Sequence, residues 1–132
     1  MKAVRVHEFG EAEVLQYENF PDLVASPGQV VMKVEAIGVN PVETYIRAGM
    51  HAIRPVLPFT PGSDAAGTVL SAGEGVSDLQ PGRRVYAAGS VGENAWTGCY
   101  AEQVVRQAEH LLPFPDNISF AEGAAIGIPY GT

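Results

Sequence analysis

Apolar and polar residues alternate along several short stretches of the chain, the pattern of β-strands with one buried face. The clearest stretch is 29–39, in which Lys33 and Glu35 lie opposite a run of alternating apolar positions. That apolar face comprises Val30, Met32, Val34, Ala36 and Gly38. Further strands are expected at 2–7, 15–19, 68–72, 83–88, 100–105 and 110–112. The pattern therefore predicts a mainly β protein.

Two short helices are also expected, each from a capping signature at its start. At 40–49, Asn40 suits the cap, Pro41 suits the first turn, and Gly49 supplies a stop. The run from Ser119 to Glu122 has the spacing of a capping box, which predicts a helix over 121–125. A loop is expected at 89–98, and the chain is expected to continue without a further helix to its last residue.

The composition agrees with many strands joined by turns. The 132 residues include 15 glycines and 10 prolines, more than a helical bundle carries. No long parallel βαβ pattern is present, and that pattern is the usual support for a bound nucleotide. We therefore expect one domain over 1–132, mainly β with a few short helices, built as an irregular β-barrel or sandwich.

The charge and the cysteine count exclude several classes of protein. A formal net charge of −7 without any basic run gives no electrostatic footprint for nucleic acid. No apolar run approaches the roughly 20 residues that span a bilayer, so no membrane partner is expected. The single cysteine, Cys99, excludes an internal disulfide framework. These features favour a cytoplasmic domain.

The residue types that carry common catalytic chemistry lack the necessary spacing. The Gly-x-Ser-x-Gly string of serine hydrolases is absent, and Cys99 is expected to be a buried thiol. The candidate metal ligands His7, His51, Cys99 and His110 are not spaced as a zinc pair, so no metal site is expected. The run Gly73-Glu74-Gly75 is not followed by a helix, so it reads as a turn rather than a phosphate loop.

The segment 40–51 gathers several functional side chains in one short helix and its exit. Locally, Asn40 and Glu43 read as capping residues, and Arg47 follows Glu43 at the spacing of a helical ion pair. Tyr45 and His51 are open to either a structural or a chemical role on local grounds.

Four motifs resemble one known family. They are GVNPVETYIRAG at 38–49, LPFTPGSDAAG at 57–67, GRRVY at 82–86 and GAAIGIPY at 123–130. Together they resemble the quinone oxidoreductase, or zeta-crystallin, branch of the zinc-independent medium-chain dehydrogenase/reductases. The resemblance implies a GroES-like catalytic domain that works beside a separate nucleotide-binding Rossmann domain, which this chain does not contain. It also implies NADPH as cofactor, a small quinone as substrate, and homo-oligomers of the full-length protein.

The same resemblance implies roles for individual residues. Tyr45 is expected to donate a hydrogen bond to the substrate and to contact the cofactor, while Asn40 and Thr132 are expected beside the nicotinamide. His51 stands where relatives often carry a second tyrosine, so it is the second candidate catalytic residue. Zinc-dependent relatives carry cysteine at Asn40 and a His-Glu pair at Ser63-Asp64, which implies a zinc-free enzyme.

Two other functions remain open from the sequence. The first is an enone or enoyl-thioester reductase of the same superfamily, which would also lack zinc. The second belongs to another class, a non-catalytic co-chaperonin-like or crystallin-like structural module. We expect the chain alone to be inactive, because the resemblance places the dinucleotide site in the missing domain.

Overall fold

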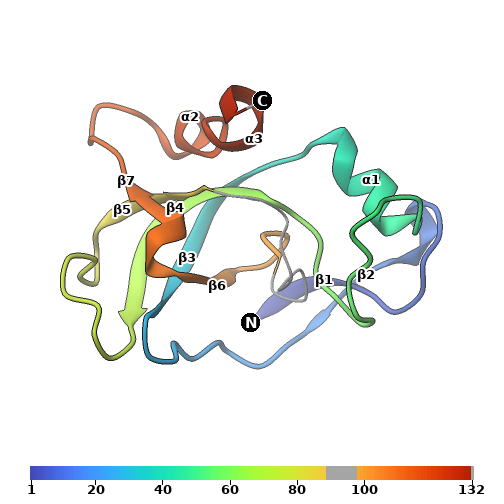
Figure 1. Ribbon diagram of the computed structural model, residues 1–132, viewed down its shortest axis with the longest axis horizontal. Coiled ribbons are helices and arrows are strands. Elements are labelled where there is room, and N and C mark those ends of the chain that lie inside the picture. Colours follow the sequence, from blue (N-terminus) through green and yellow to red (C-terminus); the bar gives the residue numbers. More distant parts are fainter. Residues whose placement is uncertain (89–97, 132) are drawn as a thin grey trace.

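The computed structural model describes residues 1–88 and 98–131 as a curled antiparallel sheet with small elements at its two ends (Figure 1). The strands are β1 (Lys2–Val6), β2 (Leu15–Asn19), β3 (Gln29–Gly38), β4 (Asp64–Ala72), β5 (Arg84–Ala87), β6 (Gln103–Gln107) and β7 (Leu111–Pro113). The α-helices are α1 (Pro41–Arg47), α2 (Phe120–Ala124) and α3 (Gly127–Gly131), and short 3-10 helices occupy Ala12–Val14 and Ala108–His110. The prediction of a mainly β, GroES-like fold is confirmed.

Five strands form the main sheet, in the order β6-β3-β4-β5-β7, and β1 pairs with β2 in a separate hairpin. In Figure 1 the helices α2 and α3 lie above the sheet, whereas α1 lies at the side that carries β1 and β2. The predicted apolar face of β3 is confirmed, because Val30 and Met32 are fully buried while Lys33 and Glu35 are exposed. That face joins residues of the other strands in the largest core cluster.

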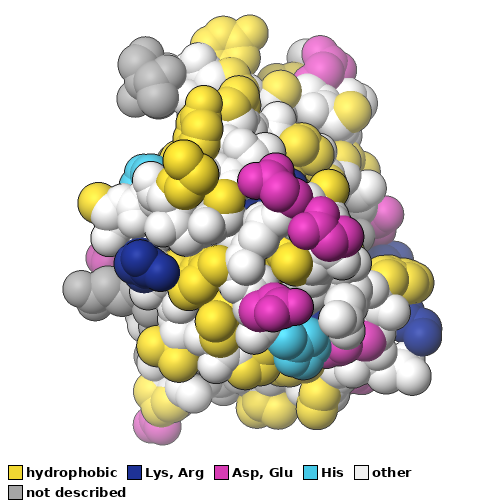
Figure 2. All heavy atoms as spheres, turned by 90° about the vertical axis from the view of Figure 1, so that its right-hand side faces the viewer, with side chains coloured by type: hydrophobic (Ala, Val, Ile, Leu, Met, Phe, Trp, Pro, Cys, Tyr) yellow, Lys and Arg dark blue, Asp and Glu magenta, His cyan; other side chains and the backbone are white. Residues whose placement is uncertain are grey.

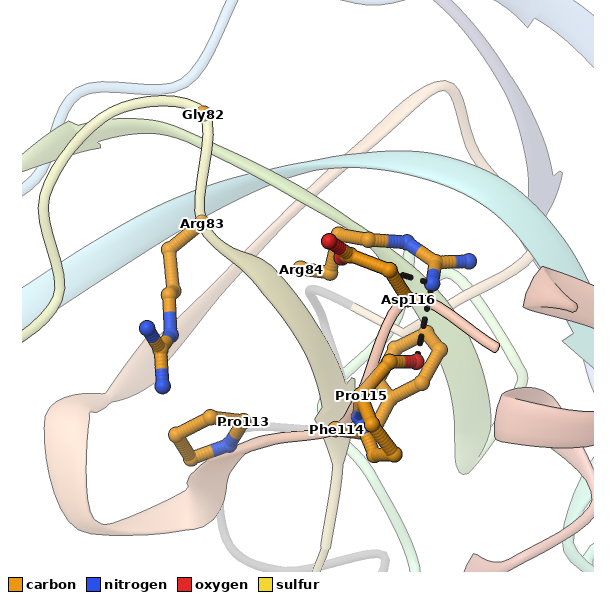
Figure 3. A pocket seen from close by; sticks show the side chains of 7 residues that line it. All are labelled: Gly82, Arg83, Arg84, Pro113, Phe114, Pro115 and Asp116. Atoms are coloured by element: carbon orange, nitrogen blue, oxygen red, sulfur yellow. Dashed lines mark hydrogen bonds and ion pairs between the residues drawn. The ribbon is translucent and has the colours of Figure 1, made fainter. Parts of the chain in front are cut away.

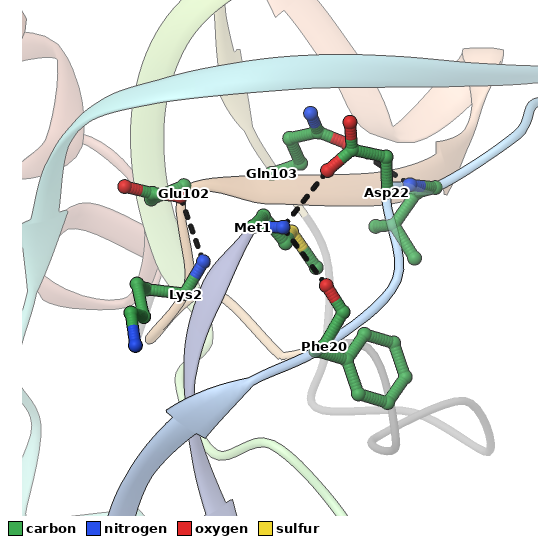
Figure 4. Close-up of polar contacts among 7 residues, drawn as sticks. Met1, Lys2, Phe20, Asp22, Glu102 and Gln103 are labelled. Atoms are coloured by element: carbon green, nitrogen blue, oxygen red, sulfur yellow. Dashed lines mark hydrogen bonds and ion pairs between the residues drawn. The ribbon is translucent and has the colours of Figure 1, made fainter.

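The hairpin is tied to the rest of the molecule by backbone contacts. Strand β1 makes isolated bridges through Ala3 to Ala101 and through Val6 to Phe59. Figure 4 shows further polar contacts here, in which the amide of Lys2 donates to Glu102 at 2.7 Å. These contacts fix the entry of the chain against the connection that precedes β6.

Arg5 departs from the alternation expected for the first strand. A charged side chain on a short strand usually faces solvent, but Arg5 is buried at 6% exposure. The guanidinium lies 4.5 Å from the centre of the Phe20 ring and donates to Thr60 Oγ1 at 3.0 Å. Burial lowers the pKa of Arg5 from its ordinary value. The partners, all distant in sequence, explain why periodicity alone missed this burial.

Strand β4 begins earlier than predicted, at Asp64 rather than at residue 68. The added residues are small, and small residues give little strand signal. The residue at position 67 must be glycine, because a Cβ at this position would lie 1.8 Å from the carbonyl oxygen of Lys33 on β3. The close approach of the two strands therefore requires glycine at the point where the sequence looks least like a strand.

Arg84 of β5 holds the segment that leads from β7 into α2, and Figure 3 shows its side chain beside Phe114 and Pro115. The guanidinium lies over the rings of Phe114 and Phe120, at 4.6 and 4.4 Å from their centres. It also donates to the carbonyl oxygens of Pro115 and Ile118 at 2.9 and 2.7 Å. Helix α2 starts with the predicted capping box, whereas α3 was not expected from the sequence. Most of the predicted 89–98 loop lies outside the described residues.

Candidate functional site

A cluster of polar side chains lies at the start of α1, between the ends of β3 and β4. We call it the acid cluster; it comprises Asn40, Glu43, Ser63, Asp64 and Tyr100. The first four of these residues are 2–7% exposed. Buried polar groups are stable only when they are hydrogen-bonded, so the partners within the cluster define its chemistry.

Glu43 is the acceptor at the centre of the acid cluster. Its carboxylate accepts from the main-chain N–H groups of Asn40 at 2.9 Å and Ser63 at 2.8 Å, and from the Tyr100 hydroxyl at 2.5 Å. Burial, and then the hydrogen bond to Glu43, raise the pKa of Tyr100 well above its ordinary value. Tyr100 is therefore a neutral hydrogen-bond donor at physiological pH.

The capping role predicted for Glu43 is confirmed, but the ion pair predicted between Glu43 and Arg47 is wrong. Arg47 turns to the N-terminal segment instead, where Nε donates to Gly10 O at 3.2 Å and Nη2 lies 3.7 Å from Glu11. The reason is burial: the Glu43 carboxylate faces into the acid cluster, where main-chain donors already satisfy it.

Asp64 is the second buried acid, and its hydrogen bonds connect two elements. Its Oδ2 accepts from Asn40 Nδ2 at 2.8 Å, and its Oδ1 accepts from the main-chain N–H of Ile128 in α3 at 3.0 Å. Asn40, which carries the predicted cofactor contact, is therefore held by α1 through Glu43 and by β4 through Asp64.

Two further polar atoms remain, the hydroxyl of Ser63 within the acid cluster and the thiol of Cys99 outside it. The Ser63 hydroxyl is buried without a hydrogen-bond partner among the described residues. Cys99 is fully buried as predicted, and its Sγ accepts from Arg106 Nη2 at 3.5 Å. Burial, as the largest cause, raises the pKa of the Cys99 thiol to about 11. The thiol is therefore protonated at neutral pH and is a poor nucleophile there.

The two predicted catalytic side chains lie outside the buried cluster. Tyr45 is on α1 with 53% of its surface exposed, and His51 follows the helix in a half-buried position. His51 Nδ1 accepts from the main-chain N–H of Ile53 at 3.0 Å. In the neutral ring this assigns the proton to Nε2, which is a donor. Thr132, the other predicted cofactor contact, lies outside the described residues.

Large apolar side chains are exposed around α1 and at the C-terminal end. They are Ile37, Val39, Tyr45, Met50, Val56 and Tyr130. Figure 2, which views the molecule from the α1 side, shows hydrophobic side chains extending down this face from the end that carries α2 and α3. Acidic and basic groups interrupt them. This face therefore mixes exposed apolar side chains with charged ones, whereas the acid cluster is buried.

Neither a metal centre nor a membrane span is evident in the described part of the chain. No group of three or more His, Cys, Asp or Glu side chains converges there on a point suited to a metal ion. No described helix has the length and apolar character needed to cross a bilayer.

The fold and the sequence define the class of this chain. It belongs to the alcohol dehydrogenase GroES-like domain family, which matches residues 26–116. Within that class it is similar to the quinone oxidoreductase of Rattus norvegicus, with 46% identity over 133 residues that cover 100% of this chain and 39% of the relative. The resemblance found in the four sequence motifs is confirmed.

Solved structures agree with this assignment. The quinone oxidoreductase from Coxiella burnetii has a TM-score of 0.87 and 27% identity, covering 97% of this chain and 41% of that chain. The Escherichia coli quinone oxidoreductase complexed with NADPH has a TM-score of 0.82 and 31% identity, covering 95% of this chain and 36% of that one. The chain thus spans about two fifths of the length of the proteins it matches.

Proposed function

We propose that this chain is the catalytic domain of an NADPH-dependent quinone reductase that works beside a nucleotide-binding Rossmann domain. The observation that carries the proposal is the match over the whole chain, at 46% identity, to a protein named quinone oxidoreductase. The NADPH complex of the E. coli relative supports the choice of cofactor. The 39% coverage of the rat relative supports the need for a further domain.

The described residues suit contact with only one end of NADPH. They contain no strand, glycine-rich turn and helix in the order that binds a pyrophosphate. The buried, oriented amide of Asn40 and the exposed hydroxyl of Tyr45 suit the nicotinamide end, and we assign them to it together with Thr132. When bound, NADPH supplies the reducing equivalents of the reaction.

Tyr45 and His51 are the proposed donors to the substrate. A quinone gains negative charge on oxygen as it is reduced, and positioned hydrogen-bond donors stabilise such charge. The Tyr45 hydroxyl and the Nε2–H of neutral His51 are donors of this kind, and the exposed apolar side chains of Val39 and Met50, which flank α1 in the sequence, suit an aromatic ring. The domain's part of the reaction is therefore to bind, orient and hydrogen-bond the acceptor.

We further propose that the reaction needs no zinc. The amide of Asn40 is committed as a donor to Asp64, whereas a zinc ligand must offer an electron pair. A quinone also has less need of a Lewis acid than an alcohol or ketone, because the aromatic ring stabilises the reduced oxygen. Treating the active enzyme with a chelator should leave its rate unchanged, and a loss restored by Zn²⁺ would refute this part.

The test of function is acceptor profiling of the complete enzyme, with NADPH oxidation followed at 340 nm. Quinones should be reduced faster than enones or enoyl thioesters, and the reverse order would favour the superfamily alternative. Replacing Tyr45 with phenylalanine should lower kcat by about 10-fold to 100-fold, because one donor to the developing charge is lost. The control is Tyr17→Phe, whose ring is 71% exposed on β2. Equal rates for Tyr45→Phe and the parent would refute the donor role.

Location and assembly complete the proposal. The absence of a described membrane-spanning helix and the quinone oxidoreductase relatives support a cytoplasmic enzyme. We propose that the complete protein is a homo-oligomer assembled through the nucleotide-binding domain. Sedimentation analysis of the complete protein should therefore give a multiple of the protomer mass, whereas a monomer would refute the assembly.

A further inference from the structure

Asp64 joins two parts of the molecule that are distant in sequence. Its carboxylate accepts from the side chain of Asn40, 24 residues away, and from the main chain of Ile128, 64 residues away. The residue is 2% exposed, so water does not compete for these bonds. One buried carboxylate thus fixes both the start of α1 and the start of α3.

Two glycines enclose this carboxylate so closely that it has little freedom to move. A Cβ on Gly127 would lie 2.1 Å from Asp64 Oδ1, and a Cβ on Gly38 would lie 2.9 Å from Asp64 Cβ. Both distances are far below normal contact. The side chain is therefore held in one orientation by the main chain on either side, as a positioning group must be.

The hydrogen bond to Asp64 also sets the orientation of the Asn40 amide. An ionised carboxylate only accepts, so the amide nitrogen of Asn40 must face it. The amide oxygen is then directed away from Asp64. Without the carboxylate, the amide could rotate by half a turn and exchange its donor with its acceptor.

We infer that Asp64 is a positioning residue for the nicotinamide end of NADPH. It acts through the fixed Asn40 amide and through the main-chain N–H of Ile128 at the start of α3. This inference rests on the proposed function, because that function places Asn40 beside the nicotinamide. Asp64 itself is buried, so it acts only through the groups to which it is hydrogen-bonded.

The test compares two ligands in the complete enzyme with the variant Asp64→Asn. NADPH carries the nicotinamide, whereas 2′-phospho-ADP-ribose lacks it and reports only on the remainder of the nucleotide site. We expect Asp64→Asn to weaken NADPH binding by about 10-fold, the effect of losing one hydrogen bond to a charged group. The affinity for 2′-phospho-ADP-ribose should not change. The control is Asp78→Asn, at an exposed carboxylate in the connection from β4 to β5.

A second variant makes the test independent of how well Asp64→Asn folds. Gly127→Ala would force the carboxylate away while keeping its charge, because of the 2.1 Å approach to Oδ1. Gly127→Ala should also weaken the binding of NADPH and leave the affinity for 2′-phospho-ADP-ribose unchanged. If both variants bind both ligands as the parent does, or if both ligands weaken equally, the inference is wrong. Failure of the parent enzyme to reduce quinones would instead refute the proposed function, since the parent rate is measured first.

Discussion

Replacing Glu43 with glutamine tests whether the acid cluster depends on a carboxylate at its centre. Glutamine keeps one oxygen and replaces the other with an NH₂ group, which cannot accept. In the parent, the main-chain N–H groups of Asn40 and Ser63 donate to the two carboxylate oxygens at 2.9 and 2.8 Å. Whichever way the glutamine amide turns, its NH₂ group must face one of these two N–H groups. One buried donor is therefore left unsatisfied in every orientation.

The expected loss of stability follows from the free-energy cost of leaving a buried N–H without an acceptor. An unsatisfied buried N–H costs about 1–3 kcal/mol, and the bond from the Tyr100 hydroxyl, now 2.5 Å long, also loses its charged acceptor. Removing a buried charge returns some desolvation free energy. We therefore expect the free energy of unfolding to fall by about 2–3 kcal/mol, which lowers Tm by roughly 10 °C in a domain of this size.

The assay is thermal unfolding of the 132-residue chain by far-ultraviolet circular dichroism. The control is Glu109→Gln, whose side chain is 79% exposed and should leave Tm within about 2 °C of the parent. A Tyr100→Phe variant in both backgrounds completes a double-mutant cycle, which should show a coupling of about 1 kcal/mol with Glu43. A Glu43→Gln protein that melts with the parent, or a cycle without coupling, would refute the reasoning.

Three further predictions concern groups away from the centre of the site. The Cys99 thiol has a pKa of about 11, above the roughly 8.5 of a thiol in the unfolded chain, so its contribution to stability is complete below pH 8.5 and is lost as pH rises through 11. Denaturant unfolding of the parent at pH 7.5 and at pH 10 should show this loss of stability. An equal loss in Cys99→Ala would assign the effect to other groups. Ser119→Ala should lower stability by about 1 kcal/mol, because Ser119 Oγ accepts from the N–H of Glu122 at 3.1 Å; unchanged denaturant midpoints would contradict the cap. Gly67→Ala should prevent folding at 37 °C, since its Cβ would lie 1.8 Å from Lys33 O, and a cooperative melt like that of the parent would contradict the strand approach.

Much of the fold could be predicted because its signals are local. Alternation along 29–39 predicted β3 and its buried face, and the spacing of Ser119 and Glu122 predicted the start of α2. What failed depends on contacts distant in sequence. The early start of β4 reflects small residues pressed against β3, and the burial of Arg5 depends on Phe20 and Thr60. The alternation of residues along one strand does not reveal which distant residues that strand will contact.

The site divides in the same way. The capping pattern correctly linked Asn40 with Glu43, since three residues separate them. It could not show that Glu43 also binds Tyr100, or that the Asn40 side chain turns to Asp64. The only sequence signal for Asp64 was its place in the family motif at 57–67, where zinc-dependent relatives carry an acidic residue. The role of Tyr45 is tested by the enzyme assay above, and the roles of His51 and Thr132 remain predictions.

Glu43 and Asp64 are held by peptide groups as well as by side chains. The N–H groups of Asn40, Ser63 and Ile128 supply three of their donors, and no substitution except proline removes a peptide N–H. Exchanging Tyr45 or His51, the proposed donors to the substrate, leaves all three of these peptide donors in place. Directed evolution can therefore vary these two exposed or half-exposed side chains without changing the main-chain groups that hold Glu43 and Asp64.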